Sequence, residues 1–501
     1  AGWDPAGAAD PSRPNEYLAA VVWLPDSSGI LVAVLSRSQQ ELSMHAFDTL
    51  GGHRGCLHRE TSQTWVNLNR MFWPCEALSI RSICAGSPEG PPDPTAGFVV
   101  GSERSGFSHL YFHHSDGRPS HPITSGRFVV TSLEGVASGG PEPTVYFTAT
   151  LEDDPTQQRL FSAPLLGDRK GGAGAAAELT PRVGSHSCVL NISRGFFVDI
   201  HSSIHEPETA TLRCLSTGRP VASLEPLPSP AEADRAKLLR APELMSIHNR
   251  SGTRLRLALF RPDPERHGPG PYPAVVSMYG GPQVQLVQNS WALTASMREQ
   301  LYRQEGYLVA KIDNRGSSNR GVEFESAIYR NFGSAEIEDQ VDGVNWLVRQ
   351  GLARPGKVLA MGWSFGGYLA ARTLMHPESR GLFAAAVAGA PVTSWDGYDT
   401  GYTERYMGMP QDNREGYERA SLLSLAAGME GSLLLVHGLL DENVHFRHTA
   451  RLIGALVAAR KRYELLVFPE ERHLPRREGD RAYMEEAVLR FVAGALGGGG
   501  P

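Results

Sequence analysis

A serine between two glycines is the residue of this sequence best suited to covalent chemistry. Gly362-Trp363-Ser364-Phe365-Gly366 follows an apolar stretch, 358–361, that predicts a buried strand, and precedes a helical run, 367–375. In this strand–turn–helix arrangement the glycines let the chain turn sharply and lift the serine hydroxyl above a sheet. A bare Gly-x-Ser-x-Gly is common, so it is the flanking strand and helix that make Ser364 a candidate nucleophile.

A serine hydroxyl needs an imidazole to take its proton, and a carboxylate to hold that imidazole in the useful tautomer. Candidates for both follow predicted strands, in the order serine, acid, histidine. Asp441 comes just after the strand 433–436, and His473 comes after the strand 465–468. Because the carboxyl ends of parallel strands meet at one edge of a sheet, we predict that Ser364, Asp441 and His473 form a catalytic triad.

Two nearby residues compete for these roles. His437 also carries an imidazole, but it precedes the acid and lies at the end of a strand, where we expect a structural residue. Glu442 is adjacent to Asp441, and adjacent residues of a loop usually point apart. The pattern therefore favours Asp441 as the acid and His473 as the base.

The anionic oxygen of a tetrahedral intermediate needs hydrogen-bond donors. The turn itself places the backbone N–H of Phe365 for this purpose. A second donor must come from the loop after an early strand, and Tyr279 directly follows the predicted strand 274–278. A tyrosine at a strand end is more often a packing residue, so the spacing alone does not decide its role.

The elements that must position these residues alternate between strand and helix. Over 241–501 this alternation predicts a doubly wound, mostly parallel sheet flanked by helices, as in an α/β-hydrolase domain. Helices are predicted at 337–349 and 480–496. Strands are predicted at 274–278, 307–312, 358–361, 384–387, 433–436 and 465–468.

Residues 1–225 instead predict short strands separated by turns. Similar units begin near residues 98, 145 and 196, a spacing of roughly 40 to 50 that matches one four-stranded propeller blade. This length holds about four to five blades, against up to about 8 in known propellers, so we expect a partial ring. A β-sandwich is the alternative. A linker rich in proline and charge, 226–240, separates the two halves.

Composition narrows the class of protein. A chain of 501 residues exceeds what one core usually organises, and a net charge of -6 lacks the basic excess of proteins that bind nucleic acid or a membrane surface. The cysteines are scattered and odd in number, and none has metal-ligand spacing, so we expect no disulfide framework, no structural metal and no cofactor. The five are Cys56, Cys75, Cys84, Cys188 and Cys214.

The same sequence suggests a location. No apolar run approaches the length of a membrane span and no signal pattern opens the chain, so a soluble, cytosolic protein is expected. Glycosylation sequons at Asn191 and Asn249 fit a secreted protein, but such triplets often arise by chance. The chain lacks an initiator methionine, which suggests a fragment or a processed form.

Several motifs resemble the prolyl oligopeptidase clan of serine peptidases, and specifically its dipeptidyl peptidase branch. Two longer segments, Tyr279 to Val287 and Glu336 to Val341, are similar to the cytosolic dipeptidyl peptidases 8 and 9, and 184–188 resembles a piece of their propeller. The resemblance is dense over about residues 241–496 and thinner before. The motifs that carry it are Gly362-Trp363-Ser364-Phe365-Gly366-Gly367-Tyr368, Tyr402-Thr403-Glu404-Arg405-Tyr406-Met407 and Asp441-Glu442-Asn443-Val444-His445-Phe446.

The resemblance implies removal of N-terminal dipeptides that carry proline or alanine in the second position. In it Tyr279 matches a tyrosine that donates to the oxyanion, and Asn443 matches a residue that contacts a substrate carbonyl. The implied partners are such peptides, with neither nucleic acid nor membrane, and a homodimer through the hydrolase domain is allowed. The residues that match the apolar pocket for the proline ring are Val392, Trp395, Tyr398, Tyr402 and Val444.

The chain also departs from the branch. Paired glutamates of the propeller bind the substrate amine there, but no Glu-Glu pair occurs before Glu470, and the branch's substrate-binding arginine has no counterpart. A cationic amine removed from water needs a carboxylate partner. What binds the amine is therefore open. So are three other readings: an oligopeptidase or acylaminoacyl peptidase with the same triad, a small-ester hydrolase, and a non-catalytic scaffold.

Overall fold

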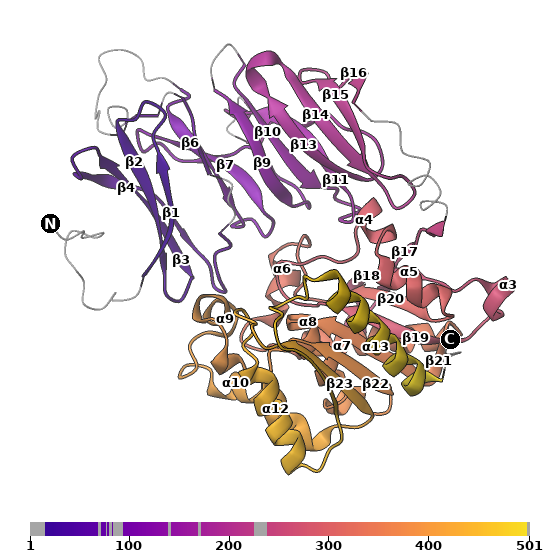
Figure 1. Ribbon diagram of the computed structural model, residues 1–501. Helices are drawn as coiled ribbons and strands as arrows, with labels where there is room; N and C mark the ends of the chain where they lie inside the picture. The colour runs from indigo at the N-terminus through magenta and orange to yellow at the C-terminus, as the bar shows by residue number, and fades with distance from the viewer. Residues whose placement is uncertain are drawn as a thin grey trace. The chain divides into compact units, whose positions relative to one another are not determined.

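A computed structural model gives the arrangement of the chain (Figure 1). It describes residues 16–68, 72–76, 78–79, 83, 94–138, 142–168, 172–224 and 238–497. The chain divides into two compact units, one of Ala1–Leu227 with Asn319–Glu323 and the other of Pro228–Ser318 with Phe324–Pro501. Most of the predicted linker, 226–240, lies outside the described residues, as does Cys84.

The first unit consists of antiparallel strands that pair mainly with their neighbours in sequence. Two sheets have four strands each, in the orders β1-β2-β3-β4 and β5-β6-β7-β8. The first contains β1 (Glu16–Trp23), β2 (Gly29–Ser36), β3 (Glu41–Asp48) and β4 (His53–Thr61). The second contains β5 (Phe72–Pro74), β6 (Gly97–Ser102), β7 (His109–His114) and β8 (His121–Pro122).

A third sheet in this unit has eight strands but contains two groups of four. The ladder of hydrogen bonds joins the two groups through one parallel pairing, of Gln158 in β11 with Ser185 in β13. The first group is β9 (Val130–Ala137), β10 (Thr144–Thr150), β11 (Gln158–Pro164) and β12 (Ala177–Glu178). The second group is β13 (Ser185–Asn191), β14 (Phe196–Ser202), β15 (Thr209–Cys214) and β16 (Pro220–Ser223). The described part of the first unit is thus a series of four-stranded groups, as a propeller requires.

Apolar side chains from successive groups pack together and form the cores of this unit. One core joins Phe98 of β6 to side chains of β2 and β3, and another joins Val99 and Phe112 to side chains of β9 and β10. Cys188, Phe197 and Leu215 join a third core with Leu160 of β11. Each group therefore buries its faces against its neighbours.

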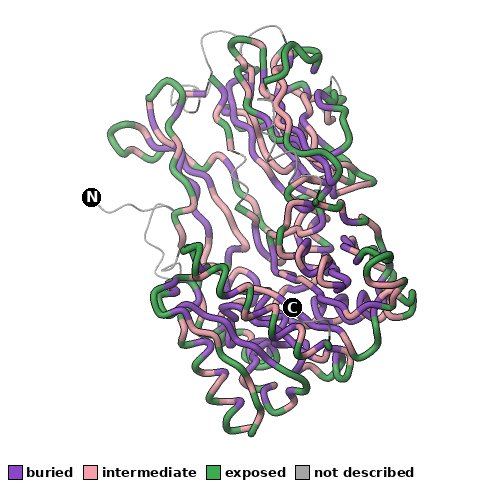
Figure 2. The backbone as a smooth tube through the Cα atoms, turned by 45° about the vertical axis from the view of Figure 1, so that its right-hand side comes forward, coloured by how far each residue is buried: buried purple, intermediate pink, exposed green. Residues whose placement is uncertain are grey.

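The second unit is built on one eight-stranded sheet. Its order is β17-β18-β20-β19-β21-β22-β23-β24, in which only the pairs β17–β18 and β18–β20 are antiparallel. Strands β20 and β22 are buried along their whole length. Figure 2 shows buried residues in purple through the centre of this unit. The strands are β17 (Glu243–His248), β18 (Arg254–Phe260), β19 (Tyr272–Met278), β20 (Leu308–Asp313), β21 (Ala353–Trp363), β22 (Ala385–Gly389), β23 (Ser432–Gly438) and β24 (Glu464–Phe468).

Helices cover this sheet. Helix α8 packs on β19, β21 and β22, α13 packs on β21, β22 and β23, and α5 packs on β18 and β20. The longer helices are α5 (Met297–Gln304), α7 (Ala335–Arg349), α8 (Phe365–Thr373), α9 (Thr400–Met407), α10 (Arg414–Ala420), α12 (Arg447–Ala458) and α13 (Glu478–Leu496). Short helices are α3 (Pro264–His267), α4 (Trp291–Thr294), α6 (Val322–Glu325) and α11 (Leu422–Leu425). The predicted α/β-hydrolase fold is confirmed.

Several features bear on the class of protein. Among the residues that the structure describes, no helix is long and apolar enough to cross a membrane, and no group of three or more His, Cys, Asp and Glu side chains could hold a metal ion. Among the described cysteines, which are Cys56, Cys75, Cys188 and Cys214, none forms a disulfide.

A buried ion pair ties β13, β14 and β15 together. Asp199 is 1% exposed and accepts hydrogen bonds from His186 Nδ1 and Arg213 Nε, each at 2.7 Å. Burial opposes the charge of Asp199, but the bonds from His186 and Arg213 outweigh it and lower the pKa of this carboxyl. The carboxylate is therefore a structural link within the sheet.

We predict that Asp199→Ala lowers the free energy of unfolding of the first unit by about 3 kcal/mol, because it leaves a buried guanidinium unpaired. Urea denaturation measures the change. Asp116→Ala is the matched control, since Asp116 pairs with Arg118 at the surface at 2.7 Å and should cost less than about 1 kcal/mol. Equal small losses in the two variants would show that the buried pair does not stabilise this sheet.

Candidate active site

Ser364 lies at a sharp turn between a strand and a helix. Strand β21 ends at Trp363 and helix α8 begins at Phe365, so Ser364 alone makes the turn. Its φ is +60°, in the left-handed region that costs energy for any residue with a Cβ. Its backbone N–H donates to Gly389 O at 2.8 Å, which anchors the strained residue to β22.

The glycines of this turn are required by close backbone contacts. A Cβ at Gly362 would lie 2.2 Å from Gly366 O, and a Cβ at Gly366 would lie 2.3 Å from Met278 O. Real Cβ atoms do not approach so closely, so both positions must stay without a side chain. The turn predicted from Gly-x-Ser-x-Gly is therefore present, and its glycines let α8 start directly against the end of β19.

Asp441 and His473 come together beside Ser364. His473 Nδ1 lies 2.7 Å from Asp441 Oδ2, where the ring N–H donates to the carboxylate. That bond leaves Nε2 as the ring atom free to accept a proton. His473 and Ser364 line the same pocket, so the structure brings the three predicted residues to one place. The carbonyl of His473 accepts from Trp363 Nε1 at 2.6 Å, which ties the histidine loop to the turn.

The carboxylate of Asp441 is buried and held by several donors. Its Oδ1 accepts the backbone N–H groups of Asn443 and Val444, at 2.9 and 2.8 Å. Burial opposes ionisation of Asp441, but the hydrogen bonds from His437, His473 and Val444 outweigh it and hold the pKa of this carboxyl well below its ordinary value. The acid is therefore charged throughout the physiological range.

His437 contributes a contact that the sequence did not predict. Its Nε2 lies 2.8 Å from Val444 O and 3.1 Å from Asp441 Oδ2, so this nitrogen carries the proton. Its Nδ1 accepts from Thr449 Oγ1 at 2.8 Å. The sequence predicts a structural residue at His437. The signal for its contact with Asp441 is their spacing of four residues across the end of β23. Glu442 instead pairs with Arg472 at the surface, at 2.8 Å.

A pocket of about 310 Å³ opens beside Ser364. Trp395 and Tyr402 stack with their rings 20° apart, and Tyr398 meets Tyr402 edge-on at 5.5 Å between centroids. The predicted pocket residue Val444 is fully buried and lies outside the lining, where its backbone serves Asp441 and His437. The lining consists of Tyr279, Trp363, Ser364, Phe365, Val392, Trp395, Tyr398, Tyr402, Asn443, His473 and Leu474.

Two tyrosines, Tyr279 and Tyr398, line the pocket beside Ser364. Tyr398 Oη donates to Asn443 Oδ1 at 2.6 Å, which turns the amide N–H groups of Asn443 toward other acceptors. Burial raises the pKa of Tyr398 to about 12 and also raises the pKa of Tyr279. Both hydroxyls therefore stay protonated. Phe365 is the first residue of α8, so its backbone N–H has no partner within the helix.

Comparisons with known proteins agree on a family. Residues 293–499 match the Prolyl oligopeptidase family, and residues 3–208 match the Dipeptidyl peptidase IV (DPP IV) N-terminal region. The chain is 32% identical to Dipeptidyl peptidase 8 of Homo sapiens, over 96% of this chain and 57% of that protein. It is 28% identical to Dipeptidyl peptidase 4 of Sus scrofa, over 77% of this chain and 50% of that protein.

A solved structure is similar as well. The crystal structure of Porphyromonas gingivalis dipeptidyl peptidase 4 matches with a TM-score of 0.83 and 25% identity, over 96% of this chain and 64% of that chain. The match to the N-terminal region confirms the predicted propeller class of the first unit. The chain spans between half and two thirds of the length of these relatives.

The geometry around Asp441 predicts a pH dependence of stability. The pKa of Asp441 in the folded protein lies below the ordinary value of 3.8. Its contribution to the free energy of unfolding is therefore complete above about pH 5 and is lost as pH falls toward the folded pKa. The free-energy gap between wild type and Asp441→Asn should therefore narrow as pH falls below about 4. Urea denaturation at several pH values measures the gap. A gap independent of pH would show that the charge of Asp441 adds nothing to stability.

Proposed function

This chain belongs to the prolyl oligopeptidase family, in its dipeptidyl peptidase branch, and we propose that it is a serine peptidase that hydrolyses peptide bonds after proline or alanine. The observation that carries the proposal is the bond between His473 and Asp441 at the pocket that also holds Ser364. That bond fixes the tautomer a general base needs.

The reaction proceeds through an acyl-enzyme. His473 Nε2 takes the proton of the Ser364 hydroxyl as its oxygen attacks the carbonyl carbon of the substrate. The imidazolium that forms is stabilised by charged Asp441, and it then protonates the departing amine. Water, activated by the same imidazole, hydrolyses the ester and frees Ser364. His437 donates to the same oxygen of Asp441 as His473 does, and it keeps the carboxylate oriented.

The negative charge on the carbonyl oxygen is met by two donors. The N–H of Phe365 points from the start of α8, and the hydroxyl of Tyr279 comes from the loop after β19. Because burial keeps the Tyr279 hydroxyl protonated, it can donate in the transition state, when the charge develops. Donors arranged in advance are worth most in such a dry site.

The aromatic pocket selects the residue before the scissile bond. The rings of Trp395, Tyr398 and Tyr402 form an apolar slot, and a proline ring gains by leaving water without losing much conformational freedom. Val392 lines the same slot. Asn443, oriented by Tyr398, donates to a carbonyl of the substrate backbone. Val444 acts on the site through its backbone, which bonds Asp441 and His437.

Other parts of the proposal come from the relatives. Those proteins are named dipeptidyl peptidases, and we extend the release of N-terminal dipeptides to this chain as part of the proposal. A cytosolic location and a homodimer formed through the hydrolase domain also stay predictions. An oligopeptidase with the same triad is the alternative. Release of dipeptides also needs a carboxylate that binds the substrate amine, and the blocked substrates below test whether the chain as sequenced supplies one.

We predict that Ser364→Ala and His473→Ala each lower kcat for a Gly-Pro anilide by at least about 10³-fold, because the triad acts as a unit. Asp441→Asn should lose about 10⁴-fold through the wrong tautomer of the imidazole. Glu442→Gln is the matched control: this neighbouring carboxylate pairs with Arg472 at the surface, so its kcat should not change. Wild-type turnover by Ser364→Ala would refute the proposed nucleophile.

A second prediction concerns the substrate amine. No adjacent pair of glutamates occurs between residues 1 and 241, so the chain as sequenced should cleave Gly-Pro and acetyl-Gly-Pro fluorogenic amides at similar kcat/KM. The preference for proline should persist, because the aromatic slot lies in the second unit. A preference for the free amine of about a hundredfold, which about 3 kcal/mol of charge pairing gives, would show that another carboxylate of this chain binds the amine.

A further inference from the structure

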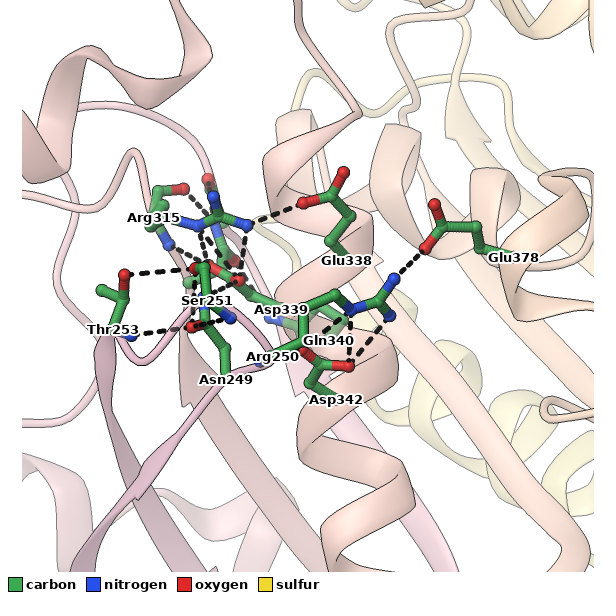
Figure 3. Close-up of polar contacts among 12 residues, drawn as sticks. Asn249, Arg250, Ser251, Thr253, Arg315, Glu338, Asp339, Gln340, Asp342 and Glu378 are labelled. Carbon is green, nitrogen blue, oxygen red and sulfur yellow. Dashed lines mark hydrogen bonds and ion pairs between the residues drawn. The ribbon is translucent and has the colours of Figure 1, made fainter.

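A buried polar network connects helix α7 to the end of β20, and the proposed chemistry does not use it (Figure 3). It includes the segment Glu336 to Val341, whose sequence is similar to the cytosolic dipeptidyl peptidases 8 and 9. Asp339 and Gln340 of this segment are fully buried. Buried polar side chains cost energy unless they are hydrogen-bonded, so their partners indicate what they do.

Asp339 fixes the chain just after β20. Its carboxylate accepts the backbone N–H of Arg315 at 2.7 Å, and the guanidinium of Arg315 through both Nε and Nη2. Asn249 Nδ2 donates to the same carboxylate at 2.8 Å, while Asn249 Oδ1 accepts from Ser251 and Thr253. Figure 3 shows these bonds meeting at Asp339. The amide of Asn249, a glycosylation sequon in sequence, is therefore committed inside the fold.

Gln340 holds the side chain of Asn314, which precedes Arg315 in the chain. Its Nε2 donates to Ile312 O at 3.0 Å and to Asn314 Oδ1 at 2.9 Å. Asn314 is itself fully buried, and its Nδ2 donates to Gly280 O at 3.0 Å and to Arg315 O at 2.7 Å. The amides of Gln340 and Asn314 thus form a directed chain of hydrogen bonds that ends on Gly280.

Gly280 directly follows Tyr279, and its backbone is pressed against Asn314. Its φ is +72°, and a Cβ there would lie 2.7 Å from Asn314 Oδ1. Further along the same loop, Asp313 accepts the backbone N–H groups of Leu286 and Val287, at 2.8 and 3.0 Å. Two consecutive residues at the end of β20 therefore fasten both parts of the loop that carries Tyr279.

We propose that Asn314, held in place by Gln340, is a positioning residue that sets where the Tyr279 hydroxyl lies relative to the oxyanion. The inference rests on the proposed role of Tyr279 as an oxyanion donor. Such a donor works only within about 2.7 to 3.1 Å of the charged oxygen, and a displacement of about 1 Å can cost about a hundredfold in rate. The loss of one of these fixing bonds lets the loop shift by an amount of that order.

A positioning role and a merely stabilising role predict different kinetics. If Asn314 acts through Tyr279, its loss lowers kcat and leaves KM nearly unchanged, because the oxyanion exists only in the transition state. The loss then disappears when Tyr279 lacks its hydroxyl, since nothing is left to position. A stabilising role instead lowers the amount of folded enzyme without changing the turnover of each folded site.

The test measures kcat and KM of a double-mutant cycle formed by Asn314→Ala and Tyr279→Phe. We expect about a 10²-fold loss of kcat for Tyr279→Phe and about a tenfold loss for Asn314→Ala. The double variant should be no slower than Tyr279→Phe alone. Active sites are counted by titration with a fluorophosphonate, so partial unfolding reduces the number of sites and not kcat.

Two further variants complete the design. Gln340→Glu keeps the size of the side chain but removes the amide that donates to Asn314, so it tests the same chain of bonds with less disturbance of the packing, and we expect a three- to tenfold loss of kcat. Arg250→Gln is the matched control. Arg250 bonds Glu378 and also Asp342, which lies in α7 as Gln340 does (Figure 3). Both bonds are at the surface, so kcat should not change.

The outcomes separate this inference from the proposed function. Unchanged kcat in Asn314→Ala and Gln340→Glu, or losses that multiply in the double variant, would overturn the positioning role while Tyr279 kept its own. Unchanged kcat in Tyr279→Phe would remove the oxyanion role of Tyr279, and the inference would fall with it.

Discussion

The carboxylate of Asp441 is removed from water at the end of β23, and a charge in that position survives only if donors surround it. Two backbone N–H groups donate to one carboxylate oxygen, and the imidazoles of His437 and His473 donate to the other. This requirement shapes the loop from β23 to α12 and fixes the ring of His473. Trp363 then joins the histidine loop to the turn at Ser364. The buried charge of Asp441 therefore links the ends of β21, β23 and β24.

A second constraint acts on the backbone. The carboxyl ends of β19 and β21 and the start of α8 approach so closely that there is no room for a Cβ at Gly362 or Gly366. This contact brings the loop after β19, with Tyr279, next to the start of α8, with the N–H of Phe365. The amides of Asn314 and Gln340 support that loop from the side of α7. Donors that are held in this way cost no reorganisation when charge develops.

Sequence patterns predicted what depends on local order and missed what depends on contacts across the sheet. The six predicted strands of the second unit correspond to β19 to β24, because buried parallel strands are continuous apolar runs. Strands β17 and β18 were missed, since they alternate and carry charged residues such as Arg254 and Arg256. In the first unit, the units expected near residues 98, 145 and 196 correspond to β6, β10 and β14, the second strand of each group. The contact of His437 with Asp441 and the absence of Val444 from the pocket lining depend on how the loop after β23 folds, which the local sequence does not show.

Covalent labelling tests most directly whether Ser364 is a nucleophile activated by His473. The protein is treated with a fluorophosphonate, digested, and the modified peptide is identified by mass spectrometry. We expect a single phosphonylated residue, Ser364, and loss of the modification when His473 is replaced by alanine. Labelling of another residue, or labelling of Ser364 at the same rate without His473, would contradict this expectation.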